Sequence, residues 1–421
     1  MNVTISPSAV GGSIEAVASK SVAHRLLICA ALANTETHIR CEQVNDDINA
    51  TVRCLCALGA NVLREGCDFT VSPLSPASLP HSAEMDCGES GSTLRFLLPV
   101  IAALGVNAAV RMHGRLSERP LSPLDEALKA HGVTLTRPEQ DTLLCCGRLT
   151  HGEYRIRGDV SSQFVSGLLF ALSCLDEPSR LIIDGTLASA PYVDMTVDAL
   201  AAFSARPART SNGFKVGGVP LVSPKHARVE GDWSGAAFPL CMGALSGKGV
   251  TVQGLSAQSR QGDRAILSVL RQFGANVTQA EDSVTVSSAP LSPIELDATH
   301  IPDLVPVIAV TACGALGTTV IHGAERLRLK ESDRIESTVA LIRSLGGHAE
   351  PLPDGLLIHG SGRLAGGSVS SYGDHRIAMS AAVASLLCDS AVTVTGAESV
   401  GKSYPAFWQA FASLGAVLRT E

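Results

Sequence analysis

The chain has 421 residues, of which 45% are hydrophobic, 17% are charged and 4% are aromatic, and its net charge is −7. The length favours two or three domains, and the apolar content suits sizeable cores and argues against a disordered chain. An acidic chain with few aromatic rings also lacks the basic footprint and the stacking platforms of a nucleic-acid-binding protein.

A helix that ends at a glycine and is followed by a short strand recurs at intervals of about 70 residues. The copies end at Gly59, Gly132, Ser204, Gly274, Gly346 and Gly415. The third copy thus has a serine where the others have a glycine. Glycine adopts the left-handed turn after a helix without strain, so many helices end in this way and a single copy is weak evidence. The even spacing of the copies is the evidence for a repeat. Six repeats are predicted, each with strand, helix, strand, helix and strand. In the fifth, strands are expected over 318–322 and 355–359, and a helix over 333–345.

Several of the predicted helices are apolar nearly all round. They cover residues 23–32, 94–104, 164–175, 305–315 and 377–387. A helix that is hydrophobic on every face belongs in a core. We therefore expect an α/β fold in which these helices lie inside and the sheets cover them.

The starts of the helices carry an unusual number of cations. Lys20, Arg334, Arg376 and Lys402 are each predicted at a helix start, where the macrodipole disfavours a cation by roughly 0.3–1 kcal/mol. An anionic ligand at converged helix ends would explain all four, because free N–H groups, dipoles and cations would then act together. It would also reconcile an acidic chain with an anionic substrate.

Other residues near these starts allow two interpretations. Ser21, Ser161 and Ser162 can cap helices or donate hydrogen bonds to a ligand. Gly91 can admit a ligand close to the backbone or only relieve a tight turn. Asp303 can cap a helix or, if it faces a cationic cleft, act as a general base.

Other kinds of site are not indicated. Glu331 lies between Lys330 and Arg334 and is explained equally well as a surface ion pair. The chain has no P-loop, GxGxxG fingerprint or nucleophile elbow, and its 12 cysteines form no CxxC pair and have no histidines at zinc-ligand spacing. We expect neither a metal nor a cofactor, and we expect small buried thiols in a reducing cytoplasm. The start of the chain has no secretory pattern, and no apolar run reaches the roughly 18 residues of a membrane span.

Eight short motifs occur in the order in which the shikimate enolpyruvyl transferases carry them, and together they resemble that family over about residues 3–411. The motifs are Ser19-Lys20-Ser21 with Arg25, 87–96, Glu118-Arg119-Pro120, 160–164, Ile301-Pro302-Asp303, 329–334, Gly373-Asp374-His375-Arg376, and Lys402. Each motif alone is weak, but eight in order at the repeat junctions make chance implausible. Glu89 and Arg326 stand where many or some members have Asn, so neither is assigned to the site.

The resemblance implies a two-domain inside-out barrel of six βαβαββ repeats, three per domain, with buried helices. The first domain would cover residues 19–229, and the second would cover residues 1–18 and 230–421. The active site would lie in the cleft between the domains. The family also implies a monomer.

The resemblance further implies two small-molecule substrates and the residues that bind them. Shikimate 3-phosphate would contact Lys20, Ser21, Arg25, Ser161, Ser162, Gln163, Ser189, Asp303 and Lys330. Phosphoenolpyruvate would contact Lys20, Gly91, Arg119, Gln163, Arg334, Arg376 and Lys402. The implied reaction is an addition followed by an elimination, with Asp303, Glu331 and Lys20 as candidate acids and bases. The family also implies glyphosate as an inhibitor that competes with phosphoenolpyruvate, because the motifs of the glyphosate-tolerant class are not seen.

Two rival functions remain at this stage. The sister enzyme that acts on UDP-N-acetylglucosamine usually has a cysteine five residues before the Arg-Pro pair, where this chain has Gly114 ahead of Arg119-Pro120. A non-catalytic phosphometabolite-binding scaffold would need the anion-binding residues but no acid–base groups. The presence of Asp303, Glu331 and Lys20 together speaks against such a scaffold.

Overall fold

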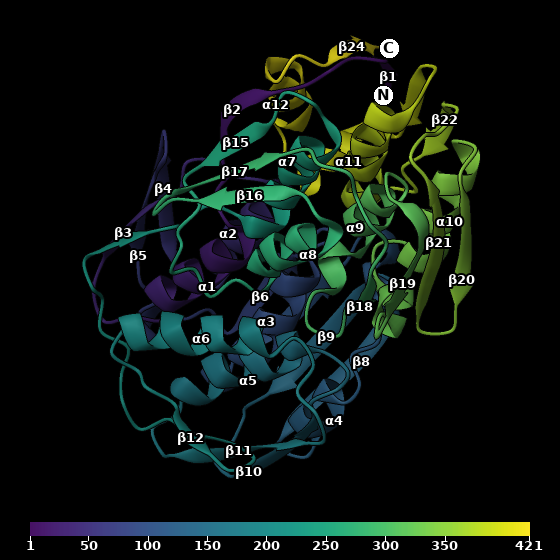
Figure 1. Cartoon of the computed structure of the whole chain (residues 1–421). Helices are drawn as coiled ribbons and strands as arrows, with labels where there is room; N and C mark the ends of the chain where they lie inside the picture. The colour runs from purple at the N-terminus through teal and green to yellow at the C-terminus, as the bar shows by residue number, and fades with distance from the viewer. The chain divides into compact units, whose positions relative to one another are not determined.

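The computed structural model describes all 421 residues, and its internal contacts divide it into two compact units. The first unit is Lys20–Val229, and the second unit combines Met1–Ser19 with Glu230–Glu421. Each unit contains three four-stranded sheets (Figure 1). None of the helices combines the length and the apolar character that spanning a bilayer would require.

The first unit contains three βαβαββ repeats. The strands of its first sheet are, in order, β14 (His226–Arg228), β3 (Thr37–Arg40), β5 (Asp68–Ser72) and β4 (Asn61–Glu65). The second sheet contains β6 (Ser82–Asp86), β7 (Asn107–Arg111), β9 (Thr142–Gly147) and β8 (Val133–Glu139). The third sheet contains β10 (Glu153–Arg157), β11 (Ser179–Asp184), β13 (Gly213–Val216) and β12 (Ala208–Thr210). Its helices are α1 (Lys20–Ala31), α2 (Asp46–Ala57), α3 (Gly91–Leu104), α4 (Leu124–Lys129), α5 (Ser162–Ser173) and α6 (Ala190–Ala202).

The second unit repeats this plan. The strands of its first sheet are, in order, β2 (Gly12–Glu15), β15 (Val250–Gln253), β17 (Ser283–Ser287) and β16 (Asn276–Gln279). The second sheet contains β18 (Glu295–Asp297), β19 (Leu316–His322), β21 (Gly355–Ser361) and β20 (His348–Leu352). The third sheet contains β22 (Gly367–Ser370), β23 (Val392–Thr395), β1 (Asn2–Ser6) and β24 (Val417–Thr420). Its helices are α7 (Trp233–Leu245), α8 (Ile266–Phe273), α9 (Val305–Ala312), α10 (Arg334–Ser344), α11 (His375–Ala384) and α12 (Phe407–Ser413).

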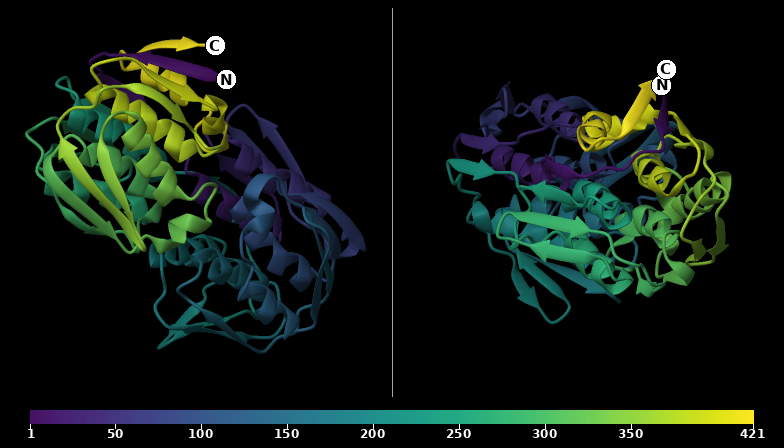
Figure 2. Two further views of the ribbon diagram at one scale, coloured as in Figure 1. Left: turned by 90° about the vertical axis from the view of Figure 1, so that its right-hand side faces the viewer. Right: turned by 45° about the horizontal axis from the view of Figure 1, so that its top comes forward.

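All six sheets share one topology, with one parallel pair of strands followed by two antiparallel pairs. The repeats are not all continuous in the chain: β14, β2 and β1 each join a sheet whose other strands lie far away in sequence. β1 lies between β23 and β24, which brings the two chain termini side by side in the second unit (Figure 2). The predicted α/β class with six βαβαββ repeats is confirmed.

The predicted inside-out arrangement is confirmed as well, because the apolar helices form the cores. Every residue of α9 is buried, and α7 and α11 pack with it among the strands of the second unit. In the first unit, α3 and α5 pack against each other and are buried along nearly their whole length. A helix without a polar face removes its apolar side chains from water only when it lies inside the fold.

The six predicted helix ends all have left-handed backbone. Their φ angles are 102° at Gly59, 93° at Gly132, 66° at Ser204, 101° at Gly274, 82° at Gly346 and 103° at Gly415. The turn is therefore the same in each repeat, including the copy in which serine replaces glycine.

The two segments that run between the units are held together within the second unit. Ala18 pairs with Gly231, and the buried side chain of Gln261 bonds to both segments. Its Oε1 accepts from Ser19 Oγ at 3.0 Å, and its Nε2 donates to Glu230 Oε1 at 2.9 Å and to the carbonyl of Gly231 at 2.8 Å. One side chain thus fixes where both crossings leave the second unit.

Candidate functional site

In the first unit, hydrogen bonds tie together the N-terminal ends of several helices. Lys20, the first residue of α1, donates to Asp47 Oδ2 at the start of α2 at 2.8 Å. Thr51 of α2 bonds Thr93 of α3 at 2.7 Å, and Thr93 donates to the α3 cap Ser90 at 2.8 Å. These bonds connect α1, α2 and α3 near the ends at which a helix can bind an anion.

Arg25 is buried in the first unit and held rigidly. Its guanidinium donates to Thr196 Oγ1 at 2.8 Å, to the carbonyl of Ser21 at 2.6 Å and to the carbonyl of Tyr192 at 2.7 Å. Burial lowers the pKa of Arg25 to about 10, so the group is still cationic at neutral pH. Burial, Lys20 and Arg25 together lower the pKa of neighbouring His24, which is therefore neutral.

Gln163 joins α5 to α3. Its Nε2 donates to Ser92 Oγ at 2.9 Å, and its Oε1 accepts from Arg95 Nη1 at 2.7 Å. The guanidinium of Arg95 also lies over the ring of Phe164, with Cζ 5.3 Å from the ring centroid. Arg95 belongs to the second motif but received no role from the sequence; its place four residues after Gly91, on the same helix face, was the available signal.

Gly91 lies directly against the guanidinium of Arg119. A Cβ at position 91 would be 2.9 Å from Arg119 Nη1 and 3.2 Å from its Cζ. Two of the seven residues that were predicted to bind phosphoenolpyruvate are therefore neighbours. The space beside Gly91, which the sequence suggested for a ligand, is filled by the Arg119 side chain in this structure.

The three predicted serines of the later helices lie at helix starts. Ser161 caps α5, since its Oγ accepts from the N–H of Gln163 at 3.3 Å, and Ser162 is buried beside it. Ser189 precedes α6 with φ at 54°, and its side chain is buried. Left-handed backbone at a residue other than glycine costs energy and clusters at functional sites, which is an independent reason to single out Ser189.

In the second unit, Arg334 is the centre of a buried ion-pair network. Its guanidinium contacts Asp374 at 2.8 Å, Asp303 at 2.9 Å and Glu331 at 2.8 Å. Only 1% of the residue is exposed. Burial alone would lower the pKa of Arg334, but the three carboxylates outweigh it and raise the pKa, so the group stays charged.

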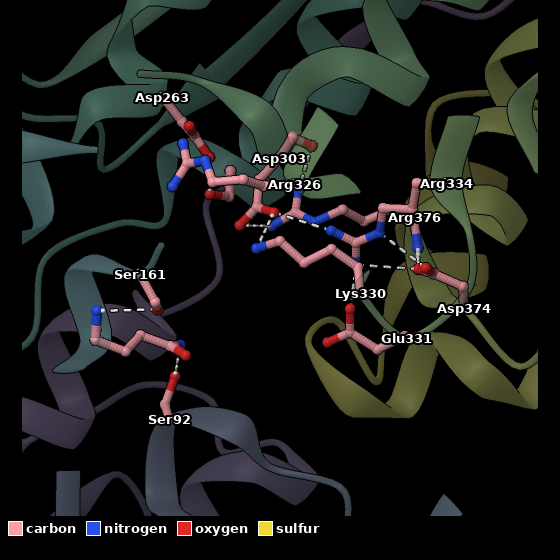
Figure 3. Close-up of polar contacts among 12 residues, drawn as sticks. Ser92, Ser161, Asp263, Asp303, Arg326, Lys330, Glu331, Arg334, Asp374 and Arg376 are labelled. Atoms are coloured by element: carbon pink, nitrogen blue, oxygen red, sulfur yellow. Dashed lines mark hydrogen bonds and ion pairs between the residues drawn. The ribbon is translucent and has the colours of Figure 1, made fainter. Parts of the chain in front are cut away.

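Asp303 lies among three cations (Figure 3). Its carboxylate is 3.4 Å from Lys330 Nζ, 2.9 Å from Arg334 Nη1 and 3.2 Å from Arg376 Nη2, and its backbone carbonyl accepts from Arg376 Nη1 at 2.9 Å. Burial would raise the pKa of Asp303, but Arg376, Lys330 and Arg334 outweigh it and hold the pKa well below the ordinary value. The structure thus brings five predicted residues together: Glu331 completes the group through Arg334.

Two further acids of this network were missed by the sequence reasoning. Asp374 caps α11, accepts from Arg334 and Ser332, and is fully buried. Asp263 is also fully buried and accepts from Ser234 at the start of α7. Burial and the nearby charge of Asp303 raise the pKa of Asp263 to about 6. Asp374 was visible in its motif, whereas no local pattern marked Asp263.

One predicted position is wrong. Lys402 does not begin a helix: it is the last residue of a short 3₁₀ helix, Ala397–Lys402, and α12 begins later, at Phe407. The Gly401-Lys402-Ser403 pattern resembles a helix start only locally. Lys20, Arg334 and Arg376 do lie in the first turn of α1, α10 and α11.

Each unit by itself therefore brings cations and polar groups together. The first unit presents Lys20, Arg25 and Arg119 with polar helix caps. The second presents a carboxylate among cations, a combination that can hold an anion and accept a proton.

The chain is similar to members of one protein family over nearly its whole length. The family model described as EPSP synthase (3-phosphoshikimate 1-carboxyvinyltransferase) matches residues 5–411. A 3-phosphoshikimate 1-carboxyvinyltransferase of Clostridium kluyveri is 40% identical over 98% of this chain and 97% of its own. One of Methanocorpusculum labreanum is 36% identical over the full length of both chains.

Solved structures are similar too. EPSP synthase from Acinetobacter baumannii superposes with a TM-score of 0.82, at 26% identity and over 100% of both chains. The enolpyruvyl transferase NikO from Streptomyces tendae gives a TM-score of 0.80 over 99% of this chain and 98% of its own. At 18% identity that second likeness concerns the fold alone.

Proposed function

The chain belongs to the EPSP synthase (3-phosphoshikimate 1-carboxyvinyltransferase) family, and we propose that it transfers the enolpyruvyl group of phosphoenolpyruvate to the 5-hydroxyl of shikimate 3-phosphate, with release of phosphate. This is a step in the shikimate pathway to aromatic amino acids. The observation that carries the proposal is the carboxylate of Asp303 held among Lys330, Arg334 and Arg376. The cations can bind the phosphate and carboxylate of phosphoenolpyruvate, and the carboxylate of Asp303 can accept the proton of the hydroxyl group.

The reaction is an addition followed by an elimination. The 5-hydroxyl oxygen attacks C2 of phosphoenolpyruvate and gives up its proton, while C3 gains a proton and becomes a methyl group. The tetrahedral product then loses phosphate from C2 and a proton from C3, which restores the double bond. We assign the hydroxyl proton to Asp303 and the proton at C3 to Glu331 or Lys20.

The charge balance around Asp303 makes this assignment chemically consistent. With three cations around it, the carboxylate has a low pKa and is a weak base. When the phosphate and carboxylate of phosphoenolpyruvate bind Arg334 and Arg376, their negative charge offsets the cations. The pKa of Asp303 then rises, and the carboxylate becomes a proton acceptor only once the substrate is in place.

We propose that residues of both units bind the same pair of substrates. The shikimate 3-phosphate contacts would come from Lys20, Ser21, Arg25, Ser161, Ser162, Gln163, Ser189, Asp303 and Lys330. The phosphoenolpyruvate contacts would come from Lys20, Gly91, Arg119, Gln163, Arg334, Arg376 and Lys402. The structure supports these sets because most of their members lie in the first turns of α1, α3, α5, α10 and α11 or in the ion-pair network around Asp303.

We also propose that the enzyme works as a monomer in the cytoplasm, with no metal or cofactor in the reaction and no nucleic-acid partner. Its twelve cysteines are all free thiols, which fits a reducing compartment.

A phosphate-release assay tests the function directly. With phosphoenolpyruvate and shikimate 3-phosphate, the purified chain should release phosphate at a steady rate, and the organic product should carry the enolpyruvyl group. With UDP-N-acetylglucosamine in place of shikimate 3-phosphate, the rate should stay at background. Turnover of the UDP-sugar would support the sister activity, and no turnover of either acceptor, despite binding of phosphoenolpyruvate, would support a non-catalytic scaffold.

A further inference from the structure

Outside this site, two neighbouring strands of the second unit bring two histidines and a glutamate together. β20 and β21 lie side by side (Figure 1). They form an antiparallel pair in which His348 lies opposite His359. Along β20, Ala349 faces the core, whereas His348 and Glu350 face outward. Because side chains alternate along a strand, the three polar groups share the outer face of the sheet.

The ligand atoms of these three side chains converge. Glu350 Oε1 is 3.8 Å from His348 Nε2 and 3.8 Å from His359 Nε2, and all three atoms lie within 4.8 Å of one another. In a tetrahedral zinc site, metal–ligand bonds of about 2.0–2.2 Å place neighbouring ligand atoms roughly 3.3 Å apart. Small side-chain rotations would close the difference, since the side chains are 64%, 53% and 40% exposed for His348, Glu350 and His359.

Strand β19, which pairs with β21, orients the imidazole of His359. Thr318 on β19 lies opposite His359 on its other side, and Thr318 Oγ1 is 3.0 Å from His359 Nδ1. If Nδ1 donates this hydrogen bond, the lone pair is on Nε2, which is the atom that faces Glu350. Hydrogen bonding of the second ring nitrogen is the usual way in which proteins fix a metal-binding histidine.

A second pair of facing histidines in the chain lacks this arrangement. His38 and His226 lie opposite each other on β3 and β14, but their rings stack at an interplanar angle of 22°. Glu36 Oε1 is 3.7 Å from His38 Nε2. The only group of three metal-ligating side chains whose ligand atoms converge is the one on β20 and β21. The His38–His226 pair therefore provides a matched control.

We propose that His348, Glu350 and His359 form a surface site for a late first-row divalent metal ion such as Zn²⁺. Two imidazoles and one carboxylate suit Zn²⁺, Ni²⁺ and Cu²⁺, and solvent completes the coordination. The bound ion connects β20 to β21 and stabilises this hairpin of the second unit. The site takes no part in enolpyruvyl transfer.

Binding of Zn²⁺ to the full-length chain tests the proposal. Calorimetric titration of the metal-free wild type should show one site that is absent, or at least tenfold weaker, in His348→Ala and in His359→Ala. The His38→Ala/His226→Ala variant should keep it. Identical Zn²⁺ isotherms for the wild type and the His348→Ala/His359→Ala double variant would overturn the proposal.

Thiolates are also zinc ligands, so a second readout identifies which side chains bind the ion. Cys56 and Cys146 are exposed. With Co²⁺ as probe, the difference spectrum between the wild type and the His348→Ala/His359→Ala variant should show d–d bands without thiolate charge-transfer absorption. Zn²⁺ should also raise the thermal unfolding temperature of the wild type more than that of this variant. A thiolate spectrum in the difference, or equal thermal shifts, would contradict a site on β20 and β21.

Discussion

At the scale of single residues, the surroundings of a carboxylate decide what it can do. Asp303 and Asp263 belong to the same unit and influence each other electrostatically, yet their pKa values move in opposite directions. Asp303 has three cations within ion-pair distance, whereas Asp263 bonds to the hydroxyl of Ser234 in a buried position. Two acids with separated pKa values are a common mark of catalytic sites.

Replacing Asp303 tests its role as proton acceptor. Asp303→Ala should retain the fold and lower turnover by roughly 10²–10⁴, the usual contribution of a positioned proton-transfer group. Asp389→Ala, which removes an exposed carboxylate of the same unit that pairs with Arg363, should leave turnover unchanged. Steady-state kinetics with thermal unfolding as a check on folding decide the matter. Asp303→Ala turnover within about threefold of the wild type would rule out the assignment.

Gly91→Ala tests how closely Arg119 and the ligand pack. The added methyl group would lie 2.9 Å from Arg119 Nη1, so the guanidinium must move away and the Michaelis constant for phosphoenolpyruvate should rise. Glyphosate is longer than phosphoenolpyruvate and should lose more, so its inhibition constant should rise by roughly tenfold or more, the effect of one misplaced methyl-sized group. Gly247→Ala, where a Cβ meets nothing within 4 Å, is the control. Unchanged glyphosate sensitivity in Gly91→Ala would show that Gly91 does not line the site.

Asp263 gives a prediction about pH and stability. Folding raises the pKa of this carboxyl from an ordinary value near 3.9 to about 6, so the folded state binds the proton more tightly. The stability that protonation provides is complete below about pH 4 and is lost as the pH rises through about 6, a change of about 3 kcal/mol. Asn cannot ionise, so Asp263→Asn should gain stability relative to the wild type over this pH range.

Thermal unfolding from pH 4 to pH 7 measures this difference. The unfolding temperature of Asp263→Asn minus that of the wild type should increase with pH and level off above about pH 6.5. The exposed control Asp389→Asn should show no such trend. A difference that stays flat across the range would mean that burial does not hold a proton on Asp263.

At the scale of elements, the repeated helix end has one imperfect copy. Ser204 has φ at 66°, and it is exposed. A residue with a Cβ is disfavoured in left-handed backbone by roughly 1 kcal/mol relative to glycine. Ser204→Gly should therefore stabilise the first unit by about that amount, which corresponds to roughly 2–4 °C in its unfolding temperature.

The reverse change provides the control for this prediction. Gly59 ends the equivalent helix of the first repeat with φ at 102°, and a Cβ there would be no closer than 3.6 Å to other atoms. Gly59→Ser should lower the unfolding temperature by a similar amount, because only the backbone conformation opposes it. The idea fails if Ser204→Gly is less stable than the wild type.

The sequence could predict the elements because their signals are local. Helix α9 has no polar face, and the glycine turns recur at even spacing, so buried helices and six repeats followed from composition and position. The partners in the site are another matter. Asp47 meets Lys20, and Asp263 meets Ser234, only after separate elements pack.

Lys402 and the triad on β20 and β21 show the same limit. A Gly-Lys-Ser pattern fits a helix start as well as a helix end, and only the folded chain decides between them. His348 and His359 become neighbours through strand register, which no short spacing motif records. Patterns along the chain thus predict what each element is, whereas contacts between elements remain hidden.

At the scale of the whole molecule, we propose that residues of both units bind the same pair of substrates. Of the residues proposed for phosphoenolpyruvate, Lys20, Gly91, Arg119 and Gln163 belong to the first unit. Arg334, Arg376 and Lys402 belong to the second. If shikimate 3-phosphate contacts both Ser161 and Asp303, as we propose, its binding would favour the state in which residues of both units bind phosphoenolpyruvate.

Calorimetric titration of phosphoenolpyruvate with and without saturating shikimate 3-phosphate tests this claim most directly. Asp303→Asn, which keeps the shape of the side chain, can replace the wild type to prevent turnover during the measurement. We predict that shikimate 3-phosphate tightens the binding of phosphoenolpyruvate by roughly 5- to 150-fold, the usual range for coupled sites. Equal affinities in its presence and absence would contradict a site assembled from both units.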